Sequence, residues 1–135
     1  MTHRELVELR NAGLKLLSTD LLLKKQVIVD IKKNNNKINE ELKPIVELEE
    51  ELNAIIKKAN ELLIVFFDES GKLLEDKKEE FDVVKVEQEV LIKAVEKNIL
   101  DMLECTVELY FIVISEDDFP EVIPAYAELL IEHYA

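Results

Sequence analysis

Two pairs of closely spaced carboxylates are the residues of this sequence best suited to chemistry. Glu47 and Glu50 stand three positions apart, and Glu79 and Asp82 repeat that spacing further along the chain. On a helix, residues three apart lie on adjacent turns of one face, so each pair would present two carboxylates together. Two such pairs on neighbouring helices would suit Mg²⁺, which prefers oxygen ligands and can activate a water molecule.

All-α nucleotide pyrophosphatases of the MazG type hold Mg²⁺ in this way. A MazG-like, Mg²⁺-dependent nucleotide pyrophosphohydrolase is therefore one hypothesis for this chain. The spacing is a weak signal, because 30 of the 135 residues are Asp or Glu and such pairs then arise by chance. We expect these carboxylates to form a solvated helix face, and the sequence predicts no metal and no other cofactor.

The other reactive residues do not complete a catalytic motif. The Gly71-Lys72 pair lacks the earlier Gly and the following Ser or Thr of a phosphate-binding loop. His3 and His133 stand near the two ends, without the Glu-x-x-His spacing of a di-iron bundle, and we expect both to be exposed. Cys105 has no CxxC partner and is expected to be a buried structural thiol. The sequence thus predicts no catalytic residue and a protein that is not an enzyme.

Charge is distributed unevenly along the chain, whose formal net charge is −13. Residues 1–43 hold 9 basic and 6 acidic side chains, whereas residues 101–135 hold 9 acidic ones and neither Lys nor Arg. The acidic segment repels phosphate backbones, so we expect no direct binding of nucleic acid. It suits a protein partner with a basic surface, including one that normally holds nucleic acid. The partner-binding residues predicted from it are Glu108, Glu116, Asp117, Asp118 and Glu121.

Hydrophobic periodicity predicts the elements that carry these residues. An apolar residue recurs every seven positions at Ile31, Ile38, Ile45, Leu52, Ala59 and Phe66. This spacing predicts a long helix over 20–67 that packs along its length against another helix. The phase continues through Pro44, which favours a kink there, because an interior proline costs about 3 kcal/mol and one backbone hydrogen bond. A break at Asn34–Asn36 is the alternative.

A second long helix is predicted over 74–106, after a loop at 68–73. Its expected seam residues are Phe81, Val84, Leu91, Val95, Met102 and Cys105, with Gln88 and Asn98 as polar members. Two long helices joined by a short loop run antiparallel, so the predicted fold is all-α, with a long helical hairpin and a coiled-coil-like seam.

Shorter elements are expected at both ends of a single domain. Thr2 and Glu5 fit a capping box, which predicts a short helix over 1–17. The acidic C-terminal segment, 107–135, is expected to end in a final helix. Residues 107–114 are rich in β-branched and aromatic side chains, and helix is favoured there over a short strand.

Cysteine content and the length of apolar runs indicate the cellular compartment of the protein. One cysteine forms no internal disulfide, and no apolar run approaches the roughly 20 residues of a membrane span. We therefore expect a cytoplasmic protein that does not enter membranes. The run from Leu62 to Phe67 is apolar all round the helix, so a homo-oligomer in which a second subunit covers it is the alternative to an ordinary core.

The order of these features resembles a known family. The resemblance is carried by Lys43-Pro44-Ile45, Asp68-Glu69-Ser70-Gly71-Lys72, Phe81, Glu87-Gln88-Glu89, Ile114-Ser115-Glu116-Asp117-Asp118-Phe119 and Leu129-Leu130-Ile131-Glu132. Together they resemble a family of small acidic helical proteins encoded by tailed phages and prophages of low-GC Gram-positive bacteria. The resemblance implies a phage accessory, assembly or host-interaction protein.

The leading hypothesis is a non-enzymatic protein–protein interaction protein, acting either as an assembly chaperone or as an acidic inhibitor of a host protein. The alternatives are the Mg²⁺-dependent hydrolase and a purely structural, self-assembling oligomer.

Overall fold

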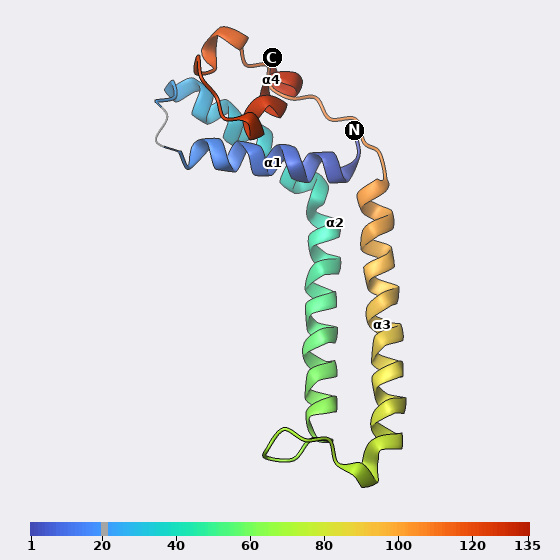
Figure 1. The fold of residues 1–135 in the computed structure, drawn as a ribbon. Coiled ribbons are helices and arrows are strands. Elements are labelled where there is room, and N and C mark those ends of the chain that lie inside the picture. Colours follow the sequence, from blue (N-terminus) through green and yellow to red (C-terminus); the bar gives the residue numbers. More distant parts are fainter. Residues whose placement is uncertain (20–21) are drawn as a thin grey trace. The chain divides into compact units, whose positions relative to one another are not determined.

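The computed structural model describes residues 1–19 and 22–135 and has the predicted all-α fold. Its helices are α1 (His3–Leu17), α2 (Lys25–Ile64), α3 (Lys78–Glu104) and α4 (Glu128–Tyr134), with short 3₁₀ turns η1 (Glu75–Lys77), η2 (Glu116–Asp118) and η3 (Ala125–Ala127) (Figure 1). In the described ranges, β pairing is limited to isolated bridges at Thr2–Thr106 and Phe67–Leu73. Among the same residues, none of the helices combines the length and apolar character that crossing a membrane requires.

The chain, which the sequence predicts to be a single domain, divides into two compact units. Unit 1 comprises residues 1–43 and 103–135, and unit 2 comprises residues 44–102. Helix α2 contributes to both and continues through Pro44 as one element, so the alternative break at Asn34–Asn36 does not occur. The predicted helix start at residue 20 lies outside the described residues, and residues 22–24 are not helical.

Unit 1 is built around α1, the first half of α2 and the C-terminal segment. Thr2 caps α1 as predicted, because its Oγ1 accepts the backbone N–H of Glu5 at 3.1 Å. The core residues from the three parts are Leu6, Leu9, Leu16, Ile31, Ile38, Leu42, Ile114, Phe119, Ala127, Leu130 and Tyr134. Gly13 allows close packing of α1 on α2, since a Cβ there would lie 3.0 Å from Asn35 Nδ2.

Residues 107–114 form neither a helix nor a strand, so the helix favoured for them is wrong. Helix α3 ends at Glu104, and the chain then runs alongside the N-terminus, where the Val107 N–H donates to Met1 O at 2.8 Å. Near Ile112, the side-chain amide of Asn34 pairs with the backbone in the way that a neighbouring strand would. Its Oδ1 accepts the Ile112 N–H at 2.7 Å and its Nδ2 donates to Ile112 O at 3.1 Å. A side-chain amide therefore satisfies backbone groups that a sheet would otherwise pair.

Unit 2 is the predicted antiparallel hairpin, formed by residues 44–64 of α2 and 78–102 of α3 lying side by side (Figure 1). Near the loop, the rings of Phe66 and Phe67 each meet Phe81 edge-on, with centroids 5.8 Å and 5.5 Å apart. The expected seam position Leu91 is 51% exposed, and Ile99, next to the expected Asn98, is buried instead. The real period of 3.6 residues per turn, together with the preference for burying apolar side chains, explains this shift.

The hairpin loop is organised by one carboxylate. Oδ1 of Asp68 accepts the Ser70 hydroxyl at 2.6 Å and the backbone N–H groups of Ser70 and Lys72, each at 2.9 Å. These bonds, first of all the one from the Ser70 hydroxyl, lower the pKa of Asp68. Gly71 takes the positive φ of 83° that the turn requires.

Candidate functional site

Three of the five predicted partner-binding residues line one hollow in unit 1. The hollow measures about 330 Å³ and lies beside η2; its lining residues are Glu116, Asp117, Phe119, Pro120, Glu121, Ile123 and Ile131. We call it the acidic hollow. The side chains of Glu116, Asp117 and Glu121 are exposed, whereas Phe119 is only 5% exposed. The site thus combines exposed acidic side chains with the partly exposed apolar side chains of Pro120, Ile123 and Ile131.

The local sequence explains how the carboxylates reach this position. Ser115 precedes η2, and its carbonyl accepts the Asp118 N–H at 2.9 Å, which closes the turn. Phe119 then enters the core in extended backbone, with Pro120 next to it. Because the buried phenylalanine anchors the end of the turn, Glu116 and Asp117 remain at the surface beside it.

The other two predicted residues lie elsewhere. Asp118 accepts a hydrogen bond from Lys24 Nζ at 2.6 Å, and this bond raises the pKa of the Lys24 ammonium group. Glu108 lines a separate hollow with His133. The sequence could predict the acidic stretch, but it did not show that one member pairs with a lysine 94 positions away.

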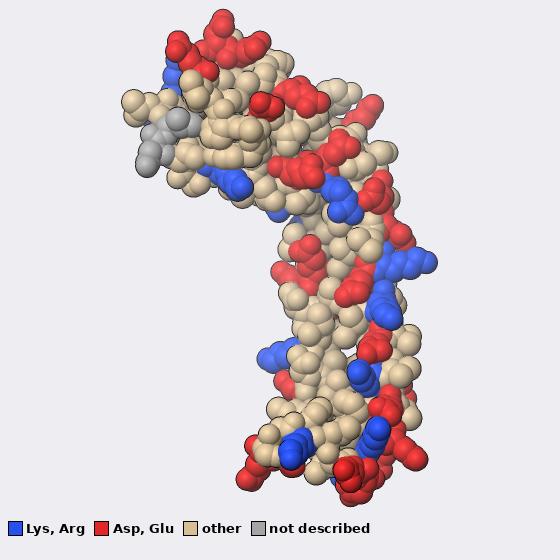
Figure 2. All heavy atoms as spheres, viewed as in Figure 1, with Lys and Arg blue, Asp and Glu red and all other residues tan. Residues whose placement is uncertain are grey.

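The charged side chains that line the acidic hollow are all acidic, and the Lys24 ammonium group lies beside them on Asp118. Neither Lys nor Arg lines it, and none occurs anywhere in residues 101–135. Figure 2 shows Asp and Glu side chains gathered over η2, at the top of the view. Of the lysines of unit 1, Lys24 is held by Asp118, and the Nζ of Lys15 lies 5.0 Å from the centre of the Tyr126 ring. The hollow can therefore attract a cation and place apolar groups next to it.

Unit 2 has two further hollows of similar character. One, of about 320 Å³, is lined by Glu49, Leu52, Glu96, Ile99 and Leu100. The other, of about 440 Å³, is lined by Phe66, Glu79, Glu80, Val83 and Val84. Each has two glutamates beside apolar side chains, whereas the acidic hollow has three carboxylates within six residues of chain. We take the acidic hollow as the candidate site for that reason.

No family model, curated protein or solved structure matches the chain.

The four carboxylates of the metal hypothesis do not come together. Glu79 lies in a hollow with Phe66, at the loop end of the hairpin. Glu50 lies near the other end of the α2 segment of unit 2, about 24 Å from Phe66 at the helical rise of 1.5 Å per residue. The pairs Glu47/Glu50 and Glu79/Asp82 therefore cannot share one Mg²⁺. No group of three or more potential metal ligands occurs among the residues that the structure describes.

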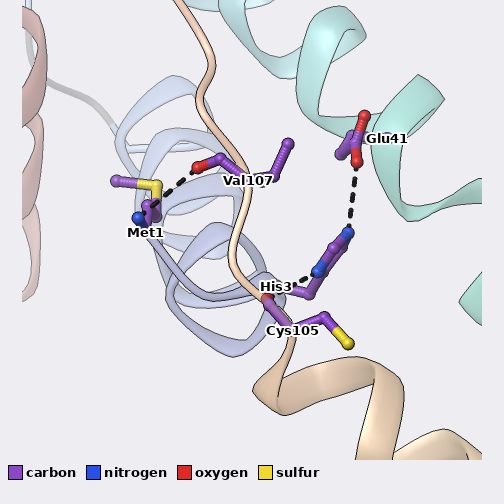
Figure 3. Close-up of polar contacts among 5 residues, drawn as sticks. All are labelled: Met1, His3, Glu41, Cys105 and Val107. Atoms are coloured by element: carbon purple, nitrogen blue, oxygen red, sulfur yellow. Dashed lines mark hydrogen bonds and ion pairs between the residues drawn. The ribbon is translucent and has the colours of Figure 1, made fainter.

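The sequence did not predict a group of polar contacts around His3 in unit 1 (Figure 3). The ring of His3, expected to be exposed, is only 12% exposed. Its Nδ1 lies 2.8 Å from Cys105 O, and its Nε2 lies 3.2 Å from Glu41 Oε1. Cys105, expected to be buried, is exposed. Both contacts of the ring are to acceptors, so a neutral imidazole donates to one of them and a protonated imidazole to both. No local pattern reveals contacts between residues about a hundred positions apart.

Proposed function

We propose that this protein is a non-enzymatic interaction protein whose acidic hollow binds a basic, amphipathic segment of a partner protein. The observation that supports this proposal is the grouping of Glu116, Asp117 and Glu121 beside the partly exposed apolar lining of the hollow, in a segment without Lys or Arg. A partner segment that alternates Lys or Arg with apolar side chains matches both the charge and the surface of the hollow.

The two kinds of lining have different tasks. Partly exposed apolar side chains, Pro120, Ile123 and Ile131, supply area that the partner removes from water, which favours the bound state. The exposed carboxylates steer the partner during diffusion and fix its orientation, so they act chiefly on the association rate and on specificity. Binding should therefore be strongly dependent on ionic strength.

We also propose a phage setting, on the strength of the family resemblance. Two roles use the same surface: shielding the basic surface of a virion component during assembly, or occupying the basic surface of a host protein. A host lysate without phage components distinguishes them, since only a host target can be captured from it.

A capture experiment with matched variants tests the proposal. The tagged protein is incubated with a nuclease-treated lysate of a Gram-positive host at low and high salt, and bound proteins are identified by mass spectrometry. The test variant is Glu116→Gln/Asp117→Asn/Glu121→Gln. The control is Glu47→Gln/Glu50→Gln/Glu51→Gln, which removes the same number of exposed charges from unit 2.

We expect the wild type and the control to retain one basic partner at low salt, and the test variant to lose it. If the test variant and the wild type retain the same partner equally, the acidic hollow is not the binding site. If nothing is captured, the experiment is repeated with a lysate of phage-infected cells, and an empty result there as well contradicts the proposal.

A further inference from the structure

The side of α3 opposite the buried Val95 and Ile99 carries an exposed apolar stripe, one end of which, Val83, also lines the hollow with Phe66. The stripe consists of Val83, Val86, Val90 and Ala94, and we call it the valine stripe. The three valines are 59%, 58% and 63% exposed. At 100° per residue these positions lie together on one face, opposite the buried Val95 and Ile99. Three half-exposed valines in one row are more than scattered surface hydrophobics.

Opposite charges stand at the two ends of this face. Glu79 precedes the valine stripe by one helical turn, and Lys97 follows it by three residues, so both extend the same row. Both side chains are exposed. A row with an acid at one end and a base at the other is complementary to itself when a second copy lies antiparallel.

We infer that α3 pairs with α3 of a second copy of this chain, antiparallel, about a two-fold axis level with Gln88. In this register Val86 faces the partner's Val90, and Val83 faces the partner's Ala94. Glu79 faces the partner's Lys97, and the two-fold axis repeats every one of these contacts. The interface is isologous, as expected for a homodimer.

The edges of the interface make the register specific. On one edge Asp82 comes opposite the partner's Lys93, which adds a second ion pair per copy. On the other edge Glu87 lies close to the axis and faces the partner's Glu87, which opposes association. Small interfaces of this kind are transient, so the dimer forms reversibly and depends on protein concentration.

Sedimentation equilibrium over about 1 µM to 1 mM protein, a span that covers weak dimers, measures the association. Val90→Glu places a carboxylate next to the axis in each copy and should weaken dimerisation at least about tenfold. The matched control is Val122→Glu, an 81% exposed valine of unit 1, which should leave the dimer unchanged. Circular dichroism checks that both variants keep their helix content.

Charge exchange tests the register itself. Glu79→Lys and Lys97→Glu should each weaken the dimer, and the two together in one chain should restore it. Glu87→Gln should strengthen it. A protein that stays monomeric throughout, equal dimerisation of Val90→Glu and Val122→Glu, or a double variant that fails to recover overturns the inference. The triple variant of the acidic hollow should dimerise like the wild type. Dimerisation and partner binding can therefore be tested independently of each other.

Discussion

At the scale of single residues, two adjacent asparagines of α2 differ sharply in their hydrogen bonding. Asn34 is fully buried and bonds both backbone groups of Ile112, whereas the Asn35 amide is buried without a hydrogen-bond partner in the described structure. We expect Asn34→Ala to lower the free energy of unfolding by about 1–3 kcal/mol, because it leaves the partly buried N–H and C=O of Ile112 without partners. Asn35→Ala should change it by less than about 1 kcal/mol. Urea unfolding followed by circular dichroism measures both; equal losses would contradict the assignment.

The hydroxyl of Tyr134 leads to a prediction about pH. Tyr134 is 1% exposed and packs edge-on against Phe111, and its hydroxyl has no hydrogen-bond partner among the described residues. Burial raises the pKa of Tyr134 well above its usual value. The folded protein therefore disfavours the phenolate, and stability falls as pH rises above the unfolded pKa of about 10, by up to about 1.4 kcal/mol per pH unit.

Tyr134→Phe removes both the titration and the unpaired hydroxyl. We expect the variant to be as stable as the wild type at pH 7, or more stable by about 1 kcal/mol, since it removes a buried polar group without a partner. Above pH 10 its advantage should grow, because the wild type alone must ionise this group on unfolding. Thermal unfolding of both proteins at pH 7 and at pH 11 measures this effect. A stability difference between variant and wild type that is the same at both pH values would refute the prediction.

Residue identities indicate the acidic stretch of the chain, but they do not indicate which residues pair with one another. The five carboxylates are recognisable from composition alone, but the partners of Asp118 and His3 come from sequence positions 94 and 38 residues away. Contacts at such separations depend on how elements pack, and a single sequence contains no local signal for them.

At the scale of elements, period-seven spacing predicted α2 and the hairpin correctly, because that pattern directly reflects burial along a helix. The same spacing placed Leu91 and Asn98 on the seam of α3. The neighbouring isoleucines fit the helical period equally well and form a more apolar face. Residues 107–114 were assigned wrongly because composition does not reveal that a side-chain amide pairs with the backbone there.

The hairpin loop gives a prediction at the same scale. Asp68→Ala removes the acceptor of three hydrogen bonds, so amide hydrogen exchange at Ser70 and Lys72 should become faster than in the wild type. Glu69→Ala, at the exposed neighbouring position, is the control and should leave exchange unchanged.

Acid should have the same effect on the wild-type loop. The pKa of Asp68 is lowered in the folded loop, so this stabilisation is present above the unfolded value of about 4 and is lost as pH falls through the lower, folded value. Amide exchange that stays constant in this pH window, once corrected for the intrinsic rate, would contradict the role of Asp68.

At the scale of the whole molecule, the two units differ in how deeply their side chains are buried. The largest fully buried side chains of the described chain are Tyr134, Leu6, Leu9, Leu16, Ile31, Ile38, Leu42, Leu130 and Asn34, and all of them belong to unit 1. In unit 2 Ile45 and Ala59 are 3% exposed, and Phe66, Val95 and Ile99 are each 9% exposed. A two-helix hairpin buries only one stripe per helix, so unit 2 should be the less protected unit.

Two leucine substitutions test this difference. Leu9→Ala in unit 1 should cost about 2–5 kcal/mol, as is usual for a fully buried leucine. Leu52→Ala in unit 2 removes a partly exposed side chain and should cost about half as much or less. Native-state hydrogen exchange should likewise show slower exchange in α1 than in residues 44–64. Equal protection of the two would contradict this division.

Unit 1 joins two stretches of chain that are separated by the whole of unit 2. During synthesis from the N-terminus, residues 1–43 therefore emerge long before residues 103–135, which supply Ile114, Leu130 and Tyr134 to the same core. The hairpin, whose contacts are local, can form while the ribosome is still translating, but the apolar core between α1 and the first half of α2 lacks the cover of the C-terminal segment until that segment emerges. Chains that end between residues 103 and 130 should thus be aggregation-prone rather than form a smaller folded protein.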